Sequence, residues 1–240
     1  MFDQKRIICI APCYNELYKI DKVVQRVNAA AIVDEMVVVD DGSSDGSPET
    51  ARAQGATVIS LGKTLGVGVA IRTGIEYAVT HEFDIIVIIA GNNKDEPREM
   101  VRLLSPITKQ GYDFVQGSRF AKGGGYGEMP LYRIFATKVH PLAFSIVAGK
   151  RVTESTNGFR AFKAALFKDK KINIWQPWLD EYELEPYLYY KVIKLGYKTT
   201  EVPVTKIYPP KKLGYTKMKP IVGWWSILRP LVLLGLGLRK

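Results

Sequence analysis

Five short apolar runs recur along the first half of the chain, and they constrain its fold more than any other feature. They lie at residues 7–11, 36–39, 57–60, 84–89 and 113–116. Helical patterns separate the runs, most clearly where Ile20, Val23, Val24 and Val27 recur on one face. Strands that alternate with helices predict a doubly wound α/β fold with a mostly parallel sheet, flanked by helices and joined by right-handed crossovers.

The composition is that of a folded protein. A chain of 240 residues is long enough for one α/β domain with a sizeable core. Cys9 and Cys13 stand too far apart in an extended segment to form a disulfide, and two cysteines alone do not complete a structural zinc site. The first residues carry charges and lead directly into a strand, so we expect no signal peptide and a reduced, cytoplasmic protein.

Polar residues follow the first two apolar runs at the point where each run ends. The first is followed by Pro-Cys-Tyr-Asn-Glu at residues 12–16, and the second by Asp-Asp-Gly-Ser-Ser-Asp-Gly at residues 40–46. A doubly wound sheet binds its ligand beyond the carboxyl ends of its strands. The two clusters are therefore predicted to form one shared site. In the structural alternative, Asp45 or Ser47 caps the helix that follows.

These two loops resemble the nucleotide-sugar half of family 2 glycosyltransferases, which implies the GT-A fold, a mostly parallel sheet of Rossmann-like type. Later motifs extend the resemblance over about residues 7–219 and narrow it to polyprenol-phosphate (dolichol-phosphate) mannose synthase and its relatives. Those motifs are Gly-Ser-Arg at 117–119, a glycine-rich stretch at 123–127, Arg133, Thr-Asn-Gly-Phe-Arg at 156–160, residues 182–185, and Glu-Val-Pro at 201–203 before a basic loop.

The resemblance implies that a hexose passes from a nucleoside diphosphate sugar, of GDP-mannose or UDP-glucose type, to a polyprenyl (dolichyl) phosphate with inversion. The residues that it implies for nucleotide-sugar binding are Pro12, Tyr14, Glu16, Asp40, Asp41 and Lys94. Those implied for catalysis are Asn92, Asp95 and Arg119, and those for the acceptor phosphate are Arg119, Arg133, Arg160, Lys212 and Lys217. Guanidinium groups bind phosphate in a bidentate manner, and an ionised lipid phosphate needs no strong general base.

The chain departs from this family at the metal-binding motif. The two acids of the family's Asp-x-Asp motif fall on Ala90 and Asn92. Magnesium and manganese ions prefer anionic oxygen ligands, so a metal site here would depend on Asn92 and a displaced carboxylate, Asp95 or Glu96. Two alternatives stay open: Lys94 stabilises the leaving diphosphate without metal, or the protein binds a nucleotide sugar or lipid without catalysis.

The nature of the acceptor is a second open question. A sugar or lipid hydroxyl, unlike a lipid phosphate, requires a carboxylate as general base. Asp180, Glu181 and Glu183 are candidates for that base, while Glu185 aligns with the glutamate of the family. A glycosyltransferase that acts on a hydroxyl is therefore the alternative hypothesis.

Basic and apolar residues gather at the C-terminal end. Residues 202–240 contain eight Lys or Arg and no Asp or Glu, and the apolar run of 231–238 is shorter than the roughly 20 residues that span a bilayer. We therefore expect a GT-A domain at 1–220 and a segment at 221–240 that lies on an anionic membrane, at its cytoplasmic face. Docking on the protein's own core, or a dimer contact, are alternatives. Interleaved aromatic residues would also suit single-stranded nucleic acid, but the apolar run favours the membrane, and no nucleic-acid partner is expected.

Overall fold

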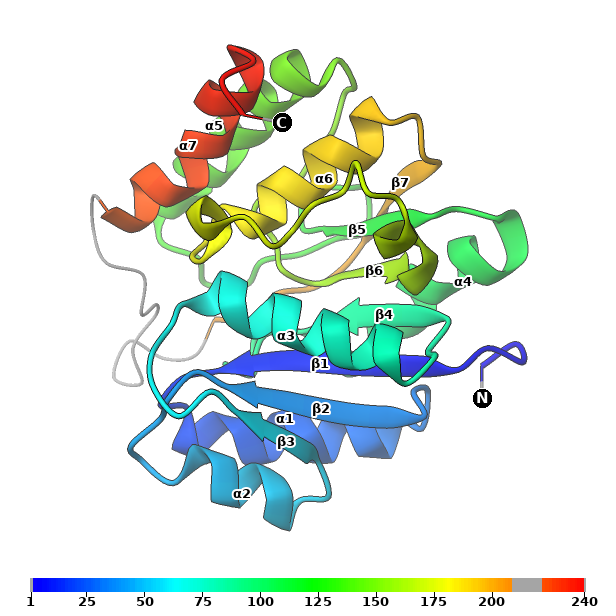
Figure 1. Cartoon of the computed structure of the whole chain (residues 1–240), viewed down its shortest axis with the longest axis vertical. Helices are drawn as coiled ribbons and strands as arrows, with labels where there is room; N and C mark the ends of the chain where they lie inside the picture. Colours follow the sequence, from blue (N-terminus) through cyan, green and yellow to red (C-terminus); the bar gives the residue numbers. More distant parts are fainter. Residues whose placement is uncertain (1, 209–221, 240) are drawn as a thin grey trace.

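A seven-stranded sheet runs through the middle of the protein in the computed structural model, which describes residues 2–208 and 222–239 (Figure 1). The strand order is β3-β2-β1-β4-β6-β5-β7, and of these strands only β6 runs antiparallel to its neighbours. The bounds are β1 Ile7–Cys13, β2 Glu35–Asp40, β3 Thr57–Ser60, β4 Ile85–Ile88, β5 Phe114–Ser118, β6 Arg160–Lys163 and β7 Thr199–Pro203.

The predicted α/β class with a mostly parallel sheet is confirmed. The five apolar runs of the sequence become β1 to β5. β1, β2, β4 and β5 are buried between helices on both sides, whereas β3, at the edge of the sheet, is only partly buried. The apolar pattern did not predict β6 or β7. β6 is only four residues long and begins and ends with a basic residue, so its strand character comes from pairing between β4 and β5.

Helices cover both faces of the sheet and enclose two apolar layers. One layer packs α1 (Leu17–Ala30), α2 (Ser47–Ala53) and α4 (Met100–Gln110), with the short turn η1 (Pro97–Glu99), against one face. The other layer contains α3 (Val67–Thr80), α5 (Leu131–Ala148), α6 (Leu184–Lys194) and α7 (Val222–Gly235), with the turns η2 (Ala164–Lys168) and η3 (Pro177–Leu179). Alternate residues of β1 serve the two layers, Ile8 and Ile10 in one and Ile7 and Cys9 in the other.

The C-terminal helix α7 docks on the protein's own body along one face. Leu231 and Leu234 are buried, Gly235 packs against Val147 of α5, and a hydrogen bond of 3.2 Å joins His140 Nε2 of α5 to the carbonyl oxygen of Ile227. Its other face exposes large apolar side chains, namely Trp225, Leu228, Val232 and, just beyond the helix, Leu236 and Leu238. Docking on the core and an exposed apolar face thus occur together. Within the described ranges, no helix has both the length and the apolar character to cross a membrane.

The start of α3 is packed tightly against the loop that follows η3. The N–H of Gly68 donates to the carbonyl oxygen of Asp180 at 2.8 Å, and a Cβ atom on Gly68 would collide with the carbonyl oxygen of Leu179. The contact joins the start of α3 to Leu179 and Asp180, which precede α6. Position 68 requires glycine because the atoms that a side chain would meet belong to the backbone and cannot move aside.

Gly68→Ala is therefore expected to destabilise the protein by about 1–3 kcal/mol, as overpacked sites do. The expected sign is informative, because glycine to alanine inside a helix ordinarily stabilises by up to about 1 kcal/mol. Gly125→Ala is the matched control, since a Cβ there meets only Thr205 Cγ2 at 3.8 Å. Urea unfolding of both variants measures the difference, and equal stabilities would contradict the close approach.

Candidate active site

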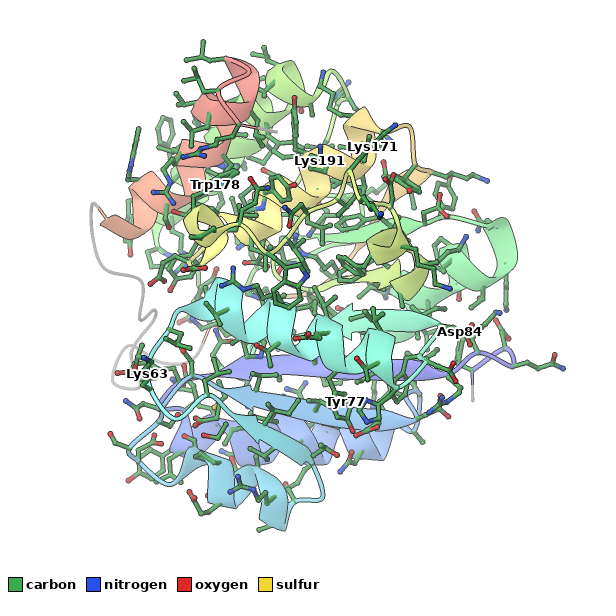
Figure 2. All side chains as sticks on the ribbon, viewed as in Figure 1. Lys63, Tyr77, Asp84, Lys171, Trp178 and Lys191 are labelled. Carbon is green, nitrogen blue, oxygen red and sulfur yellow. The ribbon has the colours of Figure 1, made fainter. Side chains whose placement is uncertain are left out.

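The carboxyl ends of the parallel strands meet at one edge of the sheet, and the residues predicted from the sequence gather there. β1, β2, β4, β5 and β7 end at this edge, and the antiparallel β6 begins at it with Arg160 (Figure 1). Figure 2 labels Lys63, in the loop after β3, at this edge and Asp84 at the opposite edge. The loops at 12–16 and 40–46 adjoin as predicted, because β1 and β2 pair along their lengths.

Short polar side chains join these two loops. The N–H of Asn15 donates to Ser43 Oγ at 2.8 Å, and Asn15 Oδ1 accepts the N–H of Ser44 at 2.8 Å. Asp45 accepts the N–H of Leu17 at 3.1 Å, so it holds the start of α1. The polar side chains of Asn15, Ser43 and Asp45 thus mainly stabilise the conformation of the two loops.

The residues after β1 that are predicted to bind the nucleotide differ in their solvent exposure. The side chain of Tyr14 is 39% exposed, whereas Pro12 is partly buried. Glu16 accepts a hydrogen bond from Lys19 at 2.7 Å and forms an ion pair with it. These three residues line the edge beside the end of β2, as expected from the parallel pairing of the two strands.

Asp40 and Asp41, also predicted to bind the nucleotide, are buried and hold neighbouring backbone. Asp41 Oδ1 accepts the N–H of Leu65 at 2.6 Å, and both carboxylate oxygens lie 3.1 Å from the N–H of Gly66. Asp40 accepts the N–H of Ser43 at 3.1 Å. Burial raises the pKa of Asp41, although the backbone N–H groups act in the opposite direction. The two acids therefore fix the loops after β2 and β3 that surround the predicted nucleotide.

The loop after β4 holds its acids in ion pairs. Asp95 is 2% exposed; its Oδ1 accepts from Lys206 Nζ at 2.6 Å and its Oδ2 from the N–H of Ala90 at 3.2 Å. Glu96 pairs with Arg26 at 2.6 Å. Asn92 Oδ1 is buried and has no hydrogen-bond partner among the described residues. The part of the chain that the structure describes contains no group of three or more His, Cys, Asp or Glu side chains that could hold a metal ion.

Lys94 lies in the same loop and is almost completely buried, with 4% of its surface exposed. Its Nζ stands 5.0 Å from the ring centroid of Tyr208, and its carbonyl oxygen accepts the N–H of Ile207 at 2.7 Å. Burial lowers the pKa of Lys94 to about 7, and the positive charges of Arg133 and Lys206 act in the same direction. The loop after β4 thus presents a lysine amino group, protonated below about pH 7, where the family resemblance led us to look for acids.

Arg119, at the end of β5, is buried in a network of hydrogen bonds. Its Nε donates to Glu154 Oε2 at 2.7 Å, its Nη2 to Thr156 Oγ1 at 2.9 Å and its Nη1 to Tyr208 Oη at 3.1 Å. Glu154 is fully buried, and Arg119 holds the pKa of that carboxyl below its usual range even though burial opposes this. This guanidinium is therefore firmly positioned by its partners.

Three cations surround one aromatic ring at this edge of the sheet. Lys94, Arg119 and Arg133 all contact Tyr208, with Arg133 Cζ 5.5 Å from the ring centroid. We call these four residues the Tyr208 cluster. Tyr208 itself is 6% exposed, and Arg133 is partly buried near the start of α5. Because Glu154 matches the charge of Arg119, the positive charge that is left for a ligand comes from Lys94 and Arg133. Cationic side chains of this kind suit a ligand that carries phosphate groups.

Arg160, predicted to bind the acceptor phosphate, lies deeper in the protein. It is 1% exposed, donates to the carbonyl oxygen of Asn157 at 2.6 Å and pairs with Glu185 at 3.0 Å. A phosphate would have to displace these partners, so the structure favours a structural role for Arg160. The predicted residues Lys212 and Lys217 lie outside the described residues.

Sequence reasoning missed Glu154, Lys206 and Tyr208 as site residues. Glu154 stands just before the Thr-x-Gly-x-Phe-Arg motif, and its pairing with Arg119 spans 35 positions. Lys206 and Tyr208 belong to the stretch without acids that follows Glu-Val-Pro, where the basic and aromatic composition was the available signal. Neither the position of Glu154 before the motif nor the composition of the later stretch indicates which side chains point into the protein.

Comparisons with known proteins show what the chain as a whole is similar to. A family model described as "Glycosyl transferase family 2" matches residues 8–175. The chain is 28% identical over 220 residues to polyprenol monophosphomannose synthase of Mycolicibacterium smegmatis, covering 89% of this chain and 81% of that protein. It is 29% identical over 219 residues to dolichyl-phosphate hexose transferase of Haloferax volcanii, covering 91% and 89%.

The fold is also that of a solved enzyme. The crystal structure of glucosyl-3-phosphoglycerate synthase from Mycobacterium tuberculosis, in complex with Mn²⁺, UDP and glucosyl-3-phosphoglycerate, superposes with a TM-score of 0.70. The sequences are 19% identical, and the match covers 98% of this chain and 80% of that one. At this identity the likeness establishes the shared fold.

Proposed function

The chain belongs to glycosyl transferase family 2 and is a glycosyltransferase with the GT-A fold, and we propose that it transfers a hexose to a polyprenyl phosphate. The donor is a nucleoside diphosphate sugar of GDP-mannose or UDP-glucose type, and the reaction inverts the anomeric centre. The observation that carries this proposal is the Tyr208 cluster, which gathers three cations at the carboxyl edge of the sheet. Relatives whose names state a polyprenol or dolichyl phosphate substrate support the acceptor.

A phosphate acceptor agrees with the charges at this edge. One oxygen of the acceptor phosphate forms a bond to the anomeric carbon, while the bond from that carbon to the diphosphate breaks and its electron pair stays on the diphosphate. An acceptor dianion becomes a phosphodiester monoanion and the nucleoside diphosphate leaves as a trianion, so no proton needs to be removed. The protein's task is to bind and neutralise phosphate charge, for which arginine and lysine are suited.

The hydroxyl alternative is less well supported. A hydroxyl acceptor requires a carboxylate that is free to accept its proton. Two of the candidate bases are engaged in ion pairs, Asp180 with Arg72 at 2.6 Å and Glu183 with Arg229 at 2.7 Å. Glu183 is also buried, with 2% of its surface exposed, so a hydroxyl acceptor would not reach it. These pairings favour the phosphate acceptor.

A magnesium or manganese ion, which the family resemblance implies, does not fit the residues present. The family's two acids are replaced by Ala90 and Asn92, and the remaining acids of the loop, Asp95 and Glu96, are paired with Lys206 and Arg26. One neutral oxygen, Asn92 Oδ1, is left in place of the anionic ligands that these ions prefer. We therefore route no step of the proposed reaction through a metal.

A membrane surface is part of the same proposal. α5 exposes an apolar stripe that consists of Leu131, Tyr132, Phe135, Val139, Leu142 and Ile146, and α7 packs beside it with its own exposed apolar residues (Figure 1). The stripe begins next to Arg133 of the Tyr208 cluster, so a lipid phosphate bound there would have its hydrocarbon chain beside apolar side chains. We propose that α5 and the segment 221–240 lie on an anionic membrane, at its cytoplasmic face.

The decisive experiment is transfer of labelled sugar from GDP-mannose, UDP-glucose and related donors to a short-chain polyprenyl phosphate. We expect one donor to yield a sugar phosphate lipid whose anomeric configuration, read by NMR, is opposite to that of the donor. Transfer to a sugar or lipid hydroxyl, with no transfer to the phosphate, would overturn the proposal. A retained configuration would overturn its inverting mechanism.

Arg133→Gln is expected to raise the KM for the polyprenyl phosphate about 10- to 100-fold, because a charge-assisted hydrogen bond contributes about 1.5–3 kcal/mol. Arg133 is only partly buried, so the free energy of unfolding should change little. Lys109→Gln, an exposed position near the end of α4, is the control for loss of one positive charge. Equal KM values for the two variants would contradict a role of Arg133 in binding the acceptor phosphate.

A further inference from the structure

The loop after β4 replaces two acids with an ammonium group at the edge of the proposed site. Lys94 stands two positions after Asn92, and its side chain turns inward to the ring of Tyr208. The carboxylates nearest in sequence are already matched by other cations: Asp95 by Lys206, and Glu96 by Arg26. The two acids of the loop are thus engaged by cations other than Lys94.

The charges that face Lys94 from other elements are mostly positive as well. Arg133 comes from α5, Lys206 from the segment after β7, and Lys19 from α1, while the acid Glu16 acts in the opposite direction. Glu16 is itself paired with Lys19 at 2.7 Å. A leaving diphosphate carries several negative charges, and Lys94 with the cations around it would neutralise them.

Resting on the proposed function, we propose that Lys94 neutralises the leaving diphosphate in place of a divalent cation, so that the enzyme binds its donor and transfers the sugar without metal. When the bond between the anomeric carbon and the diphosphate breaks, its electron pair stays on a diphosphate oxygen. The Lys94 ammonium binds this group and keeps its protons, while the acceptor oxygen completes the bond to carbon. The inference identifies the catalytic residue for leaving-group departure and adds that the reaction is independent of metal.

Asp95 acts as a positioning residue for this lysine. Its carboxylate bonds both Lys206 Nζ and the N–H of Ala90, so it joins the loop after β4 to the segment after β7. A hydrogen bond from the N–H of Ile207 to the carbonyl oxygen of Lys94 also links these two segments. Two segments more than a hundred positions apart are held together, with the ammonium and the ring of Tyr208 between them.

The first test measures binding of UDP and of GDP by calorimetry, each in EDTA and in Mg²⁺. We expect one of the two nucleotides to bind equally well in both buffers, and Lys94→Gln to weaken this binding about 10- to 100-fold. Lys163→Gln is the control, because Lys163 lies at the opposite edge of the sheet in an ion pair with Asp113. Binding that requires Mg²⁺, or that is unchanged in Lys94→Gln, would overturn the inference, as would the absence of binding for both nucleotides under every condition.

The second test restores the acids of the family. The triple variant Ala90→Asp, Asn92→Asp and Lys94→Gln is expected to bind the nucleotide only when Mg²⁺ is present, whereas Lys94→Gln alone stays weak in both buffers. Thermal unfolding confirms that each variant is folded before binding is compared. Mg²⁺ that strengthens binding to the wild-type protein as much as to the triple variant would overturn the inference.

These binding readouts separate the inference from the proposed function. Metal-independent, Lys94-dependent binding without any transfer to polyprenyl phosphate would support the role of Lys94 in holding the diphosphate and contradict the acceptor. Transfer to polyprenyl phosphate that stops in EDTA would support the acceptor and overturn the inference.

Discussion

Replacing Glu154 by Gln is expected to lower the free energy of unfolding by about 3–5 kcal/mol, the usual effect of removing one partner of a buried ion pair. Both side chains of the pair are inaccessible, with Arg119 3% and Glu154 0% exposed. The variant leaves the guanidinium buried without its counter-charge, and water does not reach it. Glu154 Oε1 also accepts the N–H of Thr156 at 2.9 Å, a bond that the glutamine oxygen is able to keep. The amide NH2 then faces Arg119, so the loss reports the charge together with the hydrogen bond from Arg119 Nε.

Urea unfolding at neutral pH measures this effect, with a double variant as the reference. Arg119→Met combined with Glu154→Gln removes the unpaired charge, so it is expected to be more stable than Glu154→Gln alone. A loss below about 1 kcal/mol for the single variant would contradict the picture of a dry ion pair, because exposed pairs contribute that little.

The same pair gives the wild-type protein a defined acid sensitivity. The folded-state pKa of Glu154 is held below its ordinary value of 4.5, so the pair contributes its full stability above that value. As the pH falls through the lowered folded-state pKa, the carboxyl is protonated and the contribution is lost. The stability difference between the wild type and Glu154→Gln is therefore expected to be large at neutral pH and to shrink in strong acid.

Most of the sheet was predictable from the sequence because β1 to β5 are short apolar runs that end in polar loops. Once strands alternate with helices, the topology itself brings the ends of β1, β2 and β4 to one edge, as observed. The family motifs then supplied the candidate site residues, whose roles stay predictions. β6 escaped prediction because a strand of four residues with basic ends has no apolar pattern of its own.

The partners of the charged residues were not predictable, because they are set by contacts between distant segments. Arg119 meets Glu154, and Arg160 meets Glu185, only after β5, β6 and α6 have packed together. In the sequence these arginines look like free phosphate ligands, and their burial appears only in the structure. The inward turn of Lys94 depends likewise on the segment after β7, which contains Tyr208.

The outward apolar stripe of α5 was hidden for a related reason. Helix α5 is apolar on most of its surface, so its sequence does not say which side packs on the sheet. Packing buries Phe144 and Ala148, whereas Phe135 and Ile146 stay 72% and 75% exposed. An exposed apolar surface of this kind is typical of a site that binds a membrane or another protein.

The double variant Phe135→Glu and Ile146→Glu is expected to weaken binding to anionic vesicles at least about 100-fold. Each large apolar side chain contributes about 1.5–3 kcal/mol when it leaves water, and the new carboxylates are repelled by anionic lipid. The control pair is Tyr18→Glu and Val101→Glu, which adds the same charge at exposed positions of α1 and α4 on the other face of the sheet. Sedimentation with vesicles of phosphatidylglycerol and phosphatidylcholine gives both affinities, and equal loss in the two double variants would contradict a specific membrane face.

Transfer assays with the same variants distinguish a membrane face from an interface between copies of the chain. A membrane face delivers the protein to its lipid acceptor and does not touch the reacting groups. Phe135→Glu with Ile146→Glu should therefore lose transfer to a long polyprenyl phosphate held in vesicles but keep transfer to a short, dispersed one. If the variant instead splits a dimer in size-exclusion chromatography and binds vesicles as tightly as the wild type, the exposed stripe is an interface between two copies, and the lipid acceptor must reach Arg133 by another route.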